Sequence, residues 1–276
     1  MTASKNRSPW AWIPSLYIAE GIPSFVVNSF TVIIYTQMGI GLKEMAFYTG
    51  WLYLPWVIKP FWSPFVDIFK TKRGWILAMQ LLLGVSMAAV GFLLPTPFFF
   101  TATLMVFWLM AFLSSTHDIA ADGFYMLALT AHQQAAFVGV RNTFYRIASL
   151  FGQGGLVMLA GHLQQRGMAT GSSWSIVFMV LSLLFLAIAL YDYLILPHSP
   201  GDKPMPGVTA RSIIRNFGMT FVTFFRKPHI VTALCFMLLY RLPEALCLKL
   251  TQPFMLATRS DGGLGLTTIQ LGLVNV

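Results

Sequence analysis

Long apolar stretches recur along the sequence, each close to the length of a membrane-spanning helix. A helix needs about 20 predominantly apolar residues to cross the hydrocarbon core of a bilayer, and short segments rich in proline, glycine or charge separate the stretches. Hydrophobic residues make up 57% of the chain and charged residues only 10%, which excludes an ordinary soluble globule. The sequence therefore predicts an all-α integral membrane protein that crosses the bilayer several times.

The spacing of the apolar stretches predicts where each span lies. We expect spans at residues 11–37, 45–68, 75–95, 98–130, 133–163, 173–196 and 229–257, with a further span beginning near Thr268. This divides the chain into a six-helix half at 1–197, a linker at 198–227 and the beginning of a second half at 228–276. In the linker, an apolar face opposite Arg211 and Arg215 predicts an amphipathic helix on the membrane surface. That face consists of Ile213, Ile214, Phe217, Phe221, Phe224 and Phe225.

The basic residues lie between the predicted spans and account for the formal net charge of +9. They are not interleaved with aromatic residues in a soluble domain, so no nucleic-acid partner is indicated. Cytoplasmic loops of membrane proteins carry an excess of Lys and Arg, which places the N-terminus and the linker in the cytoplasm. That side then holds Lys5, Arg7, Lys70, Lys72, Arg73, Lys203, Arg211, Arg215, Arg226 and Lys227, and the outside holds Lys43, Arg166 and Arg259.

Short matching segments relate the first predicted span to the seventh. They are LY at 16–17 and 239–240, IP at 22–23 with LP at 242–243, and GIGL at 39–42 with GLGL at 263–266. Such a repeat is expected of two parallel six-helix halves, an architecture found in many transporters. The second half would then stop at its second helix. We therefore expect the 276 residues to be a fragment or a truncated reading frame, and to be inactive alone.

Two acids four residues apart lie within the fourth predicted span. An ionisable side chain in a bilayer costs about 2.5–3.5 kcal/mol on insertion scales and usually lines a polar cavity. Asp118 and Asp122 share one helix face, and in the hairpin of spans four and five Asp122 has the depth of Arg141 and Asp118 that of Arg146. Two interpretations stay open. The pairs either hold the hairpin together, or the acids exchange protons while the arginines bind substrate.

Glu20 lies near the middle of the first span and is followed by Gly21 and Pro23, which loosen a helix at that depth. It needs a cationic partner, for which Lys59 and Arg241 are both suitable. Glu20 is either a proton-coupling acid or a member of an interior ion pair or gate.

Other polar residues give weaker signals. His117 stands beside Asp118, and an ordinary histidine changes charge near neutral pH, although a lone histidine is more often a hydrogen-bonded helix residue. Because no second His or Cys lies at ligand spacing, we expect no metal site. The loop DIFKTKRG at 67–74 places an acid before basic residues, which indicates either a cytoplasmic gating contact or simple membrane topology.

Two segments resemble one known family. LPWVIKPFWSPFVDIFKTKRGW at 54–75 and SSTHDIAADGFYMLAL at 114–129 resemble the AmpG-type muropeptide permeases and the related acetyl-CoA transporters of the major facilitator superfamily. The resemblance implies a major facilitator fold, proton-driven import of amino sugar-anhydromuramyl peptides, a bacterial inner-membrane location, and Asp118 and Asp122 in the positions of the family's span-four acids. His117, where a glutamine is usual, and Gly123 depart from the family's pattern.

We expect alternating access around a central polar cavity, in a monomer that uses no cofactor and whose partners are a small solute, protons and lipid. The proton-coupling candidates are Glu20, Asp118 and Asp122, the substrate-binding candidates are Lys59, Arg141, Arg146, Arg241, Tyr145 and Asn142, and the gating candidates are Asp67, Lys72 and Arg73. One alternative is a facilitator for another solute, such as an acyl-CoA, a sugar or a drug. A second is a membrane transferase using His117 and Asp118, although no nucleophile elbow, metal motif or phosphate loop accompanies them.

Overall fold

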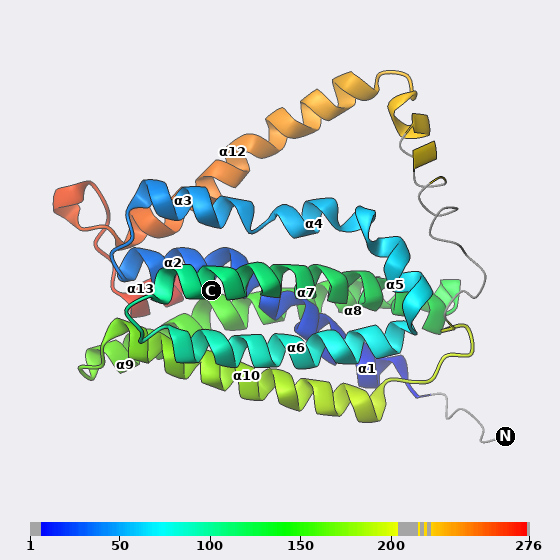
Figure 1. The fold of residues 1–276 in the computed structure, drawn as a ribbon, viewed down its shortest axis with the longest axis horizontal. Helices are drawn as coiled ribbons and strands as arrows, with labels where there is room; N and C mark the ends of the chain where they lie inside the picture. Colours follow the sequence, from blue (N-terminus) through cyan, green and yellow to red (C-terminus); the bar gives the residue numbers. More distant parts are fainter. Residues whose placement is uncertain (1–6, 204–214, 216–217, 220–221, 275–276) are drawn as a thin grey trace.

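The computed structural model describes residues 7–203, 215, 218–219 and 222–274, without the side chains of residues 67 and 248. The described part is a helical bundle and contains no strand (Figure 1). Its elements are α1 (Pro9–Phe25), η1 (Val26–Phe30), α2 (Thr31–Gln37), α3 (Leu42–Trp51), α4 (Leu54–Ile58), η2 (Lys59–Phe61), α5 (Ser63–Phe69), α6 (Lys72–Leu93), α7 (Phe99–Ala128), α8 (Ala131–Leu150), η3 (Phe151–Leu156), α9 (Val157–Gln165), α10 (Thr170–Ile195), α12 (Ile230–Leu256), η4 (Arg259–Asp261) and α13 (Thr268–Val274). The prediction of an all-α membrane fold is confirmed.

Five helical stretches of the described part are long and apolar enough to cross a membrane. They are the continuous α1–η1–α2, followed by α6, α7, α10 and α12. The stretch α8–η3–α9 is also continuous but more polar, because it carries arginine and glutamine side chains. Each of these elements begins and ends within a few residues of its predicted span, and α13 begins at Thr268 as predicted.

The second predicted span is not one helix, contrary to the expectation for residues 45–68. It is divided into α3, α4, the 3-10 turn η2 and α5. Pro55, Pro60 and Pro64 stand at the first or second position of the last three pieces. Proline lacks a backbone N–H and is tolerated in the first turn of a helix but not in its interior. Each proline therefore starts a new helical segment.

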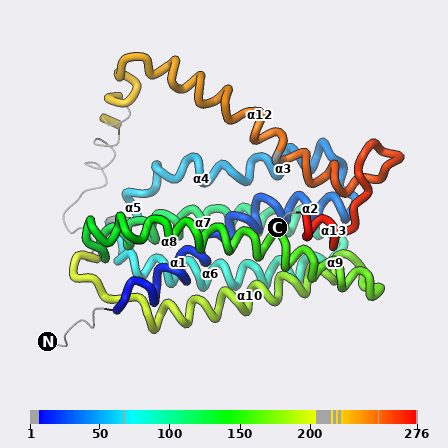
Figure 2. Tube along the Cα trace, turned by 180° about the vertical axis from the view of Figure 1, so that it is seen from behind, coloured from blue at the N-terminus to red at the C-terminus, as the bar shows by residue number. Residues whose placement is uncertain are grey.

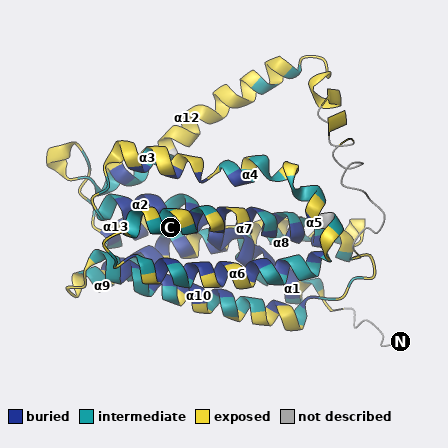
Figure 3. Cartoon of the chain, viewed as in Figure 1, coloured by how far each residue is buried: buried dark blue, intermediate teal, exposed yellow. Residues whose placement is uncertain are grey.

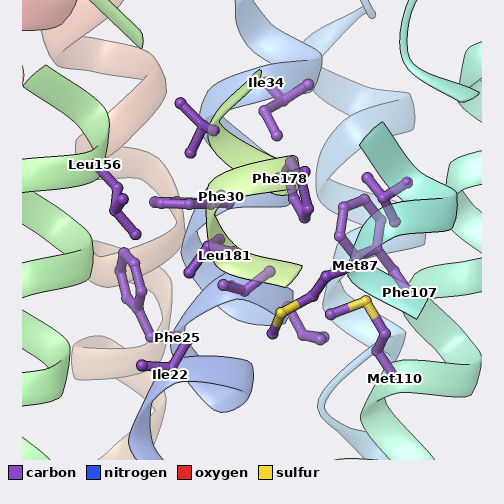
Figure 4. Packing of buried hydrophobic residues seen from close by; sticks show 14 of the residues in the cluster. Ile22, Phe25, Phe30, Ile34, Met87, Phe107, Met110, Leu156, Phe178 and Leu181 are labelled. Carbon is purple, nitrogen blue, oxygen red and sulfur yellow. The ribbon is translucent and has the colours of Figure 1, made fainter. Parts of the chain in front are cut away.

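The hydrophobic core lies between α1–η1–α2, α6, α7, η3 and α10. Figure 4 shows part of it, with Phe30 of η1 among Phe107 of α7 and Phe178 of α10. The ring centroids of Phe30 and Phe178 are 6.1 Å apart, and those of Phe107 and Phe178 are 5.9 Å apart, in edge-to-face geometry that favours aromatic pairs. This core fixes the helices that carry the polar residues described below.

Helix α12 lies apart from the core and is mostly exposed along its length (Figure 3). It approaches the bundle at its C-terminal half, where Lys249 Nζ donates a hydrogen bond to the carbonyl oxygen of Thr49 on α3, 3.3 Å away. Of the predicted surface helix, residues 211, 213, 214, 217 and 221 lie outside the described residues, while Phe224 and Phe225 are helical and exposed.

The two ends of the bundle differ in their chemistry. One end of the bundle is formed by residues 68–74, the α7–α8 turn and residues 196–203, and we call it the basic end. The start of α1 lies at the same end (Figure 2). At the opposite end, three uncharged side chains form a ring of hydrogen bonds. Gln37 Nε2 donates to Thr268 Oγ1 (2.8 Å), Thr268 Oγ1 donates to Gln164 Oε1 (2.7 Å), and Gln164 Nε2 donates to Gln37 Oε1 (3.0 Å). This ring joins α2, α9 and α13.

Candidate functional site: a charged cluster between α1, α4, α7 and α8

Asp118 of α7 is buried and faces the broken second span. Trp56 Nε1 of α4 donates a hydrogen bond of 3.0 Å to Asp118 Oδ2, and Lys59 Nζ lies 3.8 Å from the same oxygen. Trp56 and Lys59 are three residues apart, so a helical turn presents both on one side. The prediction that Asp118 pairs with Arg146 is therefore wrong, because Lys59 is the cation beside Asp118.

Asp122 forms the ion pair with Arg141 that the hairpin geometry predicts. Arg141 Nη1 lies 3.0 Å from Asp122 Oδ1, and the hydroxyl of Tyr17 on α1 donates to the same oxygen at 3.3 Å. The guanidinium carbon of Arg141 also lies 4.8 Å from the ring centroid of Tyr17 and 5.6 Å from that of Tyr125. A guanidinium between a carboxylate and two aromatic faces is held by both electrostatic and cation–π attraction.

The rotation of α8 explains why only one of its arginines joins the cluster. Arg146 comes five residues after Arg141, which is about 140° around an α-helix, and its side chain is exposed. Asn142 is exposed as well. Tyr145 lies one helical turn after Arg141 and reaches Ser24 of α1, with 3.4 Å between the two hydroxyl oxygens. Equal depth in the hairpin is thus not enough to pair two side chains.

Glu20 of α1 is buried beside these residues. A Cβ on the next residue, Gly21, would lie 3.0 Å from the carbonyl oxygen of Tyr145, so glycine allows α1 to approach α8 closely. The Glu20 carboxylate is repelled by Asp118 and Asp122, and it is attracted by the nearby cations. Its Oε2 atom has no hydrogen-bond partner in the described part of the chain.

The two cations offered as partners for Glu20 behave differently. Lys59 is among the charges that attract Glu20, but the carboxylate with which it forms an ion pair is Asp118. Arg241 of α12 is exposed and pairs with Glu244 one turn further along its own helix, so the structure does not bring it to the cluster. We define the charged cluster as the carboxylates Glu20, Asp118 and Asp122 with the cations Lys59 and Arg141. Three acids therefore share two cations.

Lys72 and Arg73, two of the three gating candidates, lie at the basic end, where the side chain of Arg73 binds neighbouring backbone. Arg73 Nη2 donates to the carbonyl oxygen of Tyr193 (2.6 Å), and Arg73 Nε donates to that of Leu196 (3.2 Å), at the end of α10. The carboxylate of Asp202 accepts from the backbone N–H of Lys72 and of Arg73, at 2.5 and 3.0 Å. Carboxylates are favourable at such a helix N-terminus. The side chain of the third gating candidate, Asp67, lies outside the described residues.

A second group of polar residues lies between α1, α6, α7 and α10. In the described part of the structure, no cation is hydrogen-bonded to this group. Gln80 Nε2 of α6 donates to Asp192 Oδ2 of α10 (2.7 Å) and lies 3.3 Å from His117 Nε2 of α7. Ser15 Oγ of α1 donates to Asp192 Oδ1 at 2.5 Å. We call these four residues the sealed network, since His117, Gln80 and Asp192 have no exposed surface.

Sequence reasoning did not assign Trp56, Asp192, Gln80 or Asp202 to a site. The position of Trp56 one helical turn before Lys59 could have indicated that both side chains face the same partner, Asp118. Asp202 and its backbone partners are separated by 130 residues, and nothing local indicates that contact. The described residues contain no group of three or more His, Cys, Asp or Glu that could hold a metal ion.

The helical bundle, the membrane-length helices and the buried charges define a multi-pass membrane protein of the major facilitator type. A family model described as the BT1 family matches residues 18–243, and the chain belongs to that family.

Several known proteins are similar to this chain. The anhydromuropeptide permease of Escherichia coli K12 is 27% identical over 268 residues, which are 94% of this chain and 50% of the permease. A Rickettsia conorii protein whose name assigns it to the AmpG transporters is 24% identical over 251 residues, 87% of this chain and 58% of its own length. An uncharacterized protein of Haemophilus influenzae is 26% identical over 248 residues, 86% of this chain and 54% of its own length. The chain thus spans about half the length of these relatives.

Proposed function

We propose that the protein is a secondary transporter that imports muropeptides together with protons by alternating access. The observation that carries the proposal is the charged cluster, in which three carboxylates share two cations among membrane-length helices. An ionisable group at this depth is costly to retain and typically marks a substrate or proton pathway. The names of the relatives agree with this class of protein.

The excess carboxylate supplies the proton coupling. Glu20 has an oxygen without a hydrogen-bond partner in the described structure and lies among two other acids, so a proton on Glu20 or Asp118 removes like-charge repulsion. A proton on Asp118 releases Lys59, and a proton on Asp122 releases Arg141, so that the freed cation becomes available to the cargo. The return of the cation to its acid expels the proton on the other side. Glu20, Asp118 and Asp122 are the proposed proton carriers.

The same cluster suits a cargo that bears both carboxylates and sugar rings. Arg141 presents a guanidinium, which matches a carboxylate with two parallel hydrogen bonds, and Lys59 presents a compact ammonium. The rings of Tyr17 and Tyr125 lie against Arg141, and the indole N–H of Trp56 contacts Asp118, the carboxylate beside Lys59. An anhydromuramyl peptide carries both kinds of group. The site is therefore proposed for binding such a cargo, with Tyr145 at its edge.

The basic end is proposed to face the cytoplasm of a bacterium, with the membrane being the inner membrane. Its excess of lysine and arginine follows the charge asymmetry of inner-membrane proteins. Lys72 and Arg73 are proposed to act in gating together with Asp67, since the contacts of Arg73 and Asp202 join the loop before α6 to the end of α10.

Uptake by the complete protein tests the proposal. Proteoliposomes should accumulate a radiolabelled anhydromuramyl tripeptide only when the outside is more acidic than the inside, and Glu20→Gln should abolish accumulation. Glu44→Gln, which changes an exposed acid on α3, is the matched control and should leave uptake unchanged. Accumulation that is independent of the pH gradient would disprove the coupling. Uptake of an acyl-CoA, a simple sugar or a drug in place of the tripeptide would disprove the cargo.

A further inference from the structure

A pocket of about 620 Å³ opens at the basic end, next to the charged cluster. Its wall comes from residues 59–64, from the start of α6, from α7 and from residues 201–203. Four lysines and two aspartates line it: Lys59, Lys70, Lys72, Lys203, Asp122 and Asp202. We call it the lysine pocket.

The two acids of the lysine pocket already have donors of their own. Asp122 pairs with Arg141, and Asp202 accepts two backbone hydrogen bonds at the start of α6. Lys70 and Lys203 are exposed and form no ion pair with a described residue. The charges of Lys70 and Lys203 are therefore not neutralised by the two described carboxylates that line the pocket.

Lys59 connects the pocket to the charged cluster. Its ammonium lies 3.8 Å from Asp118 Oδ2, which is longer than the usual 2.7–3.2 Å of a hydrogen bond. An ammonium group has three donors, so Lys59 can turn toward an anion in the pocket without leaving the neighbourhood of Asp118. No other lysine is assigned to both sites among the described residues.

Gly123 gives the pocket one of its walls. A Cβ at this position would lie 2.9 Å from Cε of Lys72, so glycine leaves room beside α7 for the stem of Lys72, which a larger residue would displace.

We propose that the lysine pocket is the release-side site for the cargo and binds its carboxylates, with Lys59 moving between Asp118 and the departing cargo. The oxyanion preference follows from the lysines, and the cargo's identity rests on the proposed function. The volume supports a whole small molecule, because ligand pockets commonly measure about 300–1,000 Å³. A single phosphate of a lipid headgroup would fill only a small part of it. Membrane topology alone requires basic residues near the loop, but not their convergence on one pocket.

Binding to the complete protein in detergent tests this site without a gradient or a membrane. The probes are an anhydromuramyl tripeptide, the same compound with its carboxyl groups converted to amides, tricarballylate and short-chain phosphatidylglycerol. The variant is Lys70→Gln with Lys203→Gln, and the control is Lys43→Gln with Arg166→Gln, two exposed residues at the opposite end. The variant should weaken tripeptide binding about tenfold, as expected when charge-assisted hydrogen bonds are lost. Binding of the amide, and all binding by the control, should not change.

Each outcome bears on the inference. An equal loss for tripeptide and amide, or no loss for the tripeptide, would overturn it. If phosphatidylglycerol binding falls in the variant while tripeptide binding does not, the pocket belongs to lipid and the inference is wrong. If the wild type binds no tripeptide, the proposal that muropeptides are the cargo is disproved. Binding of tricarballylate then tests whether the lysine pocket binds oxyanions at all. A tenfold loss of tricarballylate affinity in the variant would uphold an oxyanion site, and an unchanged affinity would refute it.

Discussion

Two neighbouring residues of α7, His117 and Asp118, belong to polar groups of opposite character. Asp118 faces α4, where Lys59 and Trp56 contact it. His117 faces α6 and α10, where its partner Gln80 is hydrogen-bonded to Asp192. Successive residues of a helix point about 100° apart, so one helix can supply both groups within a single turn.

The difference lies in charge and access. The charged cluster contains formal cations and is partly open, since the side chains of Lys59 and Asp122 are 35% and 39% exposed. In the sealed network, His117, Gln80 and Asp192 are 0% exposed. A buried group that is enclosed on all sides can stabilise helix packing but cannot meet a cargo. We therefore expect the charged cluster to govern transport and the sealed network to govern stability.

Replacing one acid in each group, Asp118 in the charged cluster and Asp192 in the sealed network, is the strongest test of this distinction. Asp118→Asn should lower gradient-driven uptake about a hundredfold, equivalent to roughly 2.7 kcal/mol, because Asp118 is the more buried partner of Lys59 and an amide cannot carry the proton. Asp192→Asn should leave uptake within about twofold, since an amide can accept from Gln80 and donate to Ser15. Initial uptake rates in proteoliposomes measure both. Equal losses in the two variants would abolish the distinction between the groups.

Removing the Asp192 side chain should affect stability and not specificity. Asp192→Ala deprives Ser15 and Gln80 of a partner in a sealed site, which should cost about 1–3 kcal/mol per group left unsatisfied. Thermal unfolding in detergent should show a lower midpoint for Asp192→Ala and a nearly native midpoint for Asp192→Asn. An unchanged midpoint in the alanine variant would mean that the sealed network does not stabilise the bundle.

The two arginines of α8 provide a matched pair for the charged cluster. Arg141→Gln should reduce uptake about tenfold, equivalent to roughly 1.4 kcal/mol, which is less than for Asp118 because the carboxylate of Asp122, the partner of Arg141, is more exposed than that of Asp118. Arg146→Gln should have no effect, since Arg146 points away from the cluster. The same uptake assay distinguishes them. A larger loss for Arg146 would place the substrate contact on the other side of α8.

The parts of the charged cluster that depend only on the distance between residues along the chain could be predicted from the sequence. The spacing of Asp118 and Asp122 gives one helix face, and the hairpin depth gives the Asp122–Arg141 pair. Depth alone wrongly pairs Asp118 with Arg146, because rotation about the helix axis turns Arg146 away from α7. The functional roles of these residues stay predictions.

The remaining features depend on packing between distant segments. The helical architecture followed from hydrophobicity and span length, and the division of the second span at Pro55, Pro60 and Pro64 could have been read from the prolines themselves. The contact of Asp202 with the start of α6 could not, because neither partner has a local signature. The sealed network likewise requires the relative rotation of α1, α6, α7 and α10, which sequence periodicity leaves undetermined.

The smallest expected effect concerns His117, which distinguishes the two groups most sharply because it adjoins Asp118 in sequence. His117→Gln keeps a side chain able to hydrogen-bond Gln80 and removes the only imidazole of the sealed network. Because His117 has no exposed surface, we expect uptake within about twofold of wild type and a pH profile of uptake that keeps its shape. The measurement is initial uptake between pH 5 and 8, the range in which an ordinary histidine titrates. If the substitution removed the pH dependence while Asp118→Asn did not, the proton pathway would run through the sealed network, and the assignment of transport to the charged cluster would be wrong.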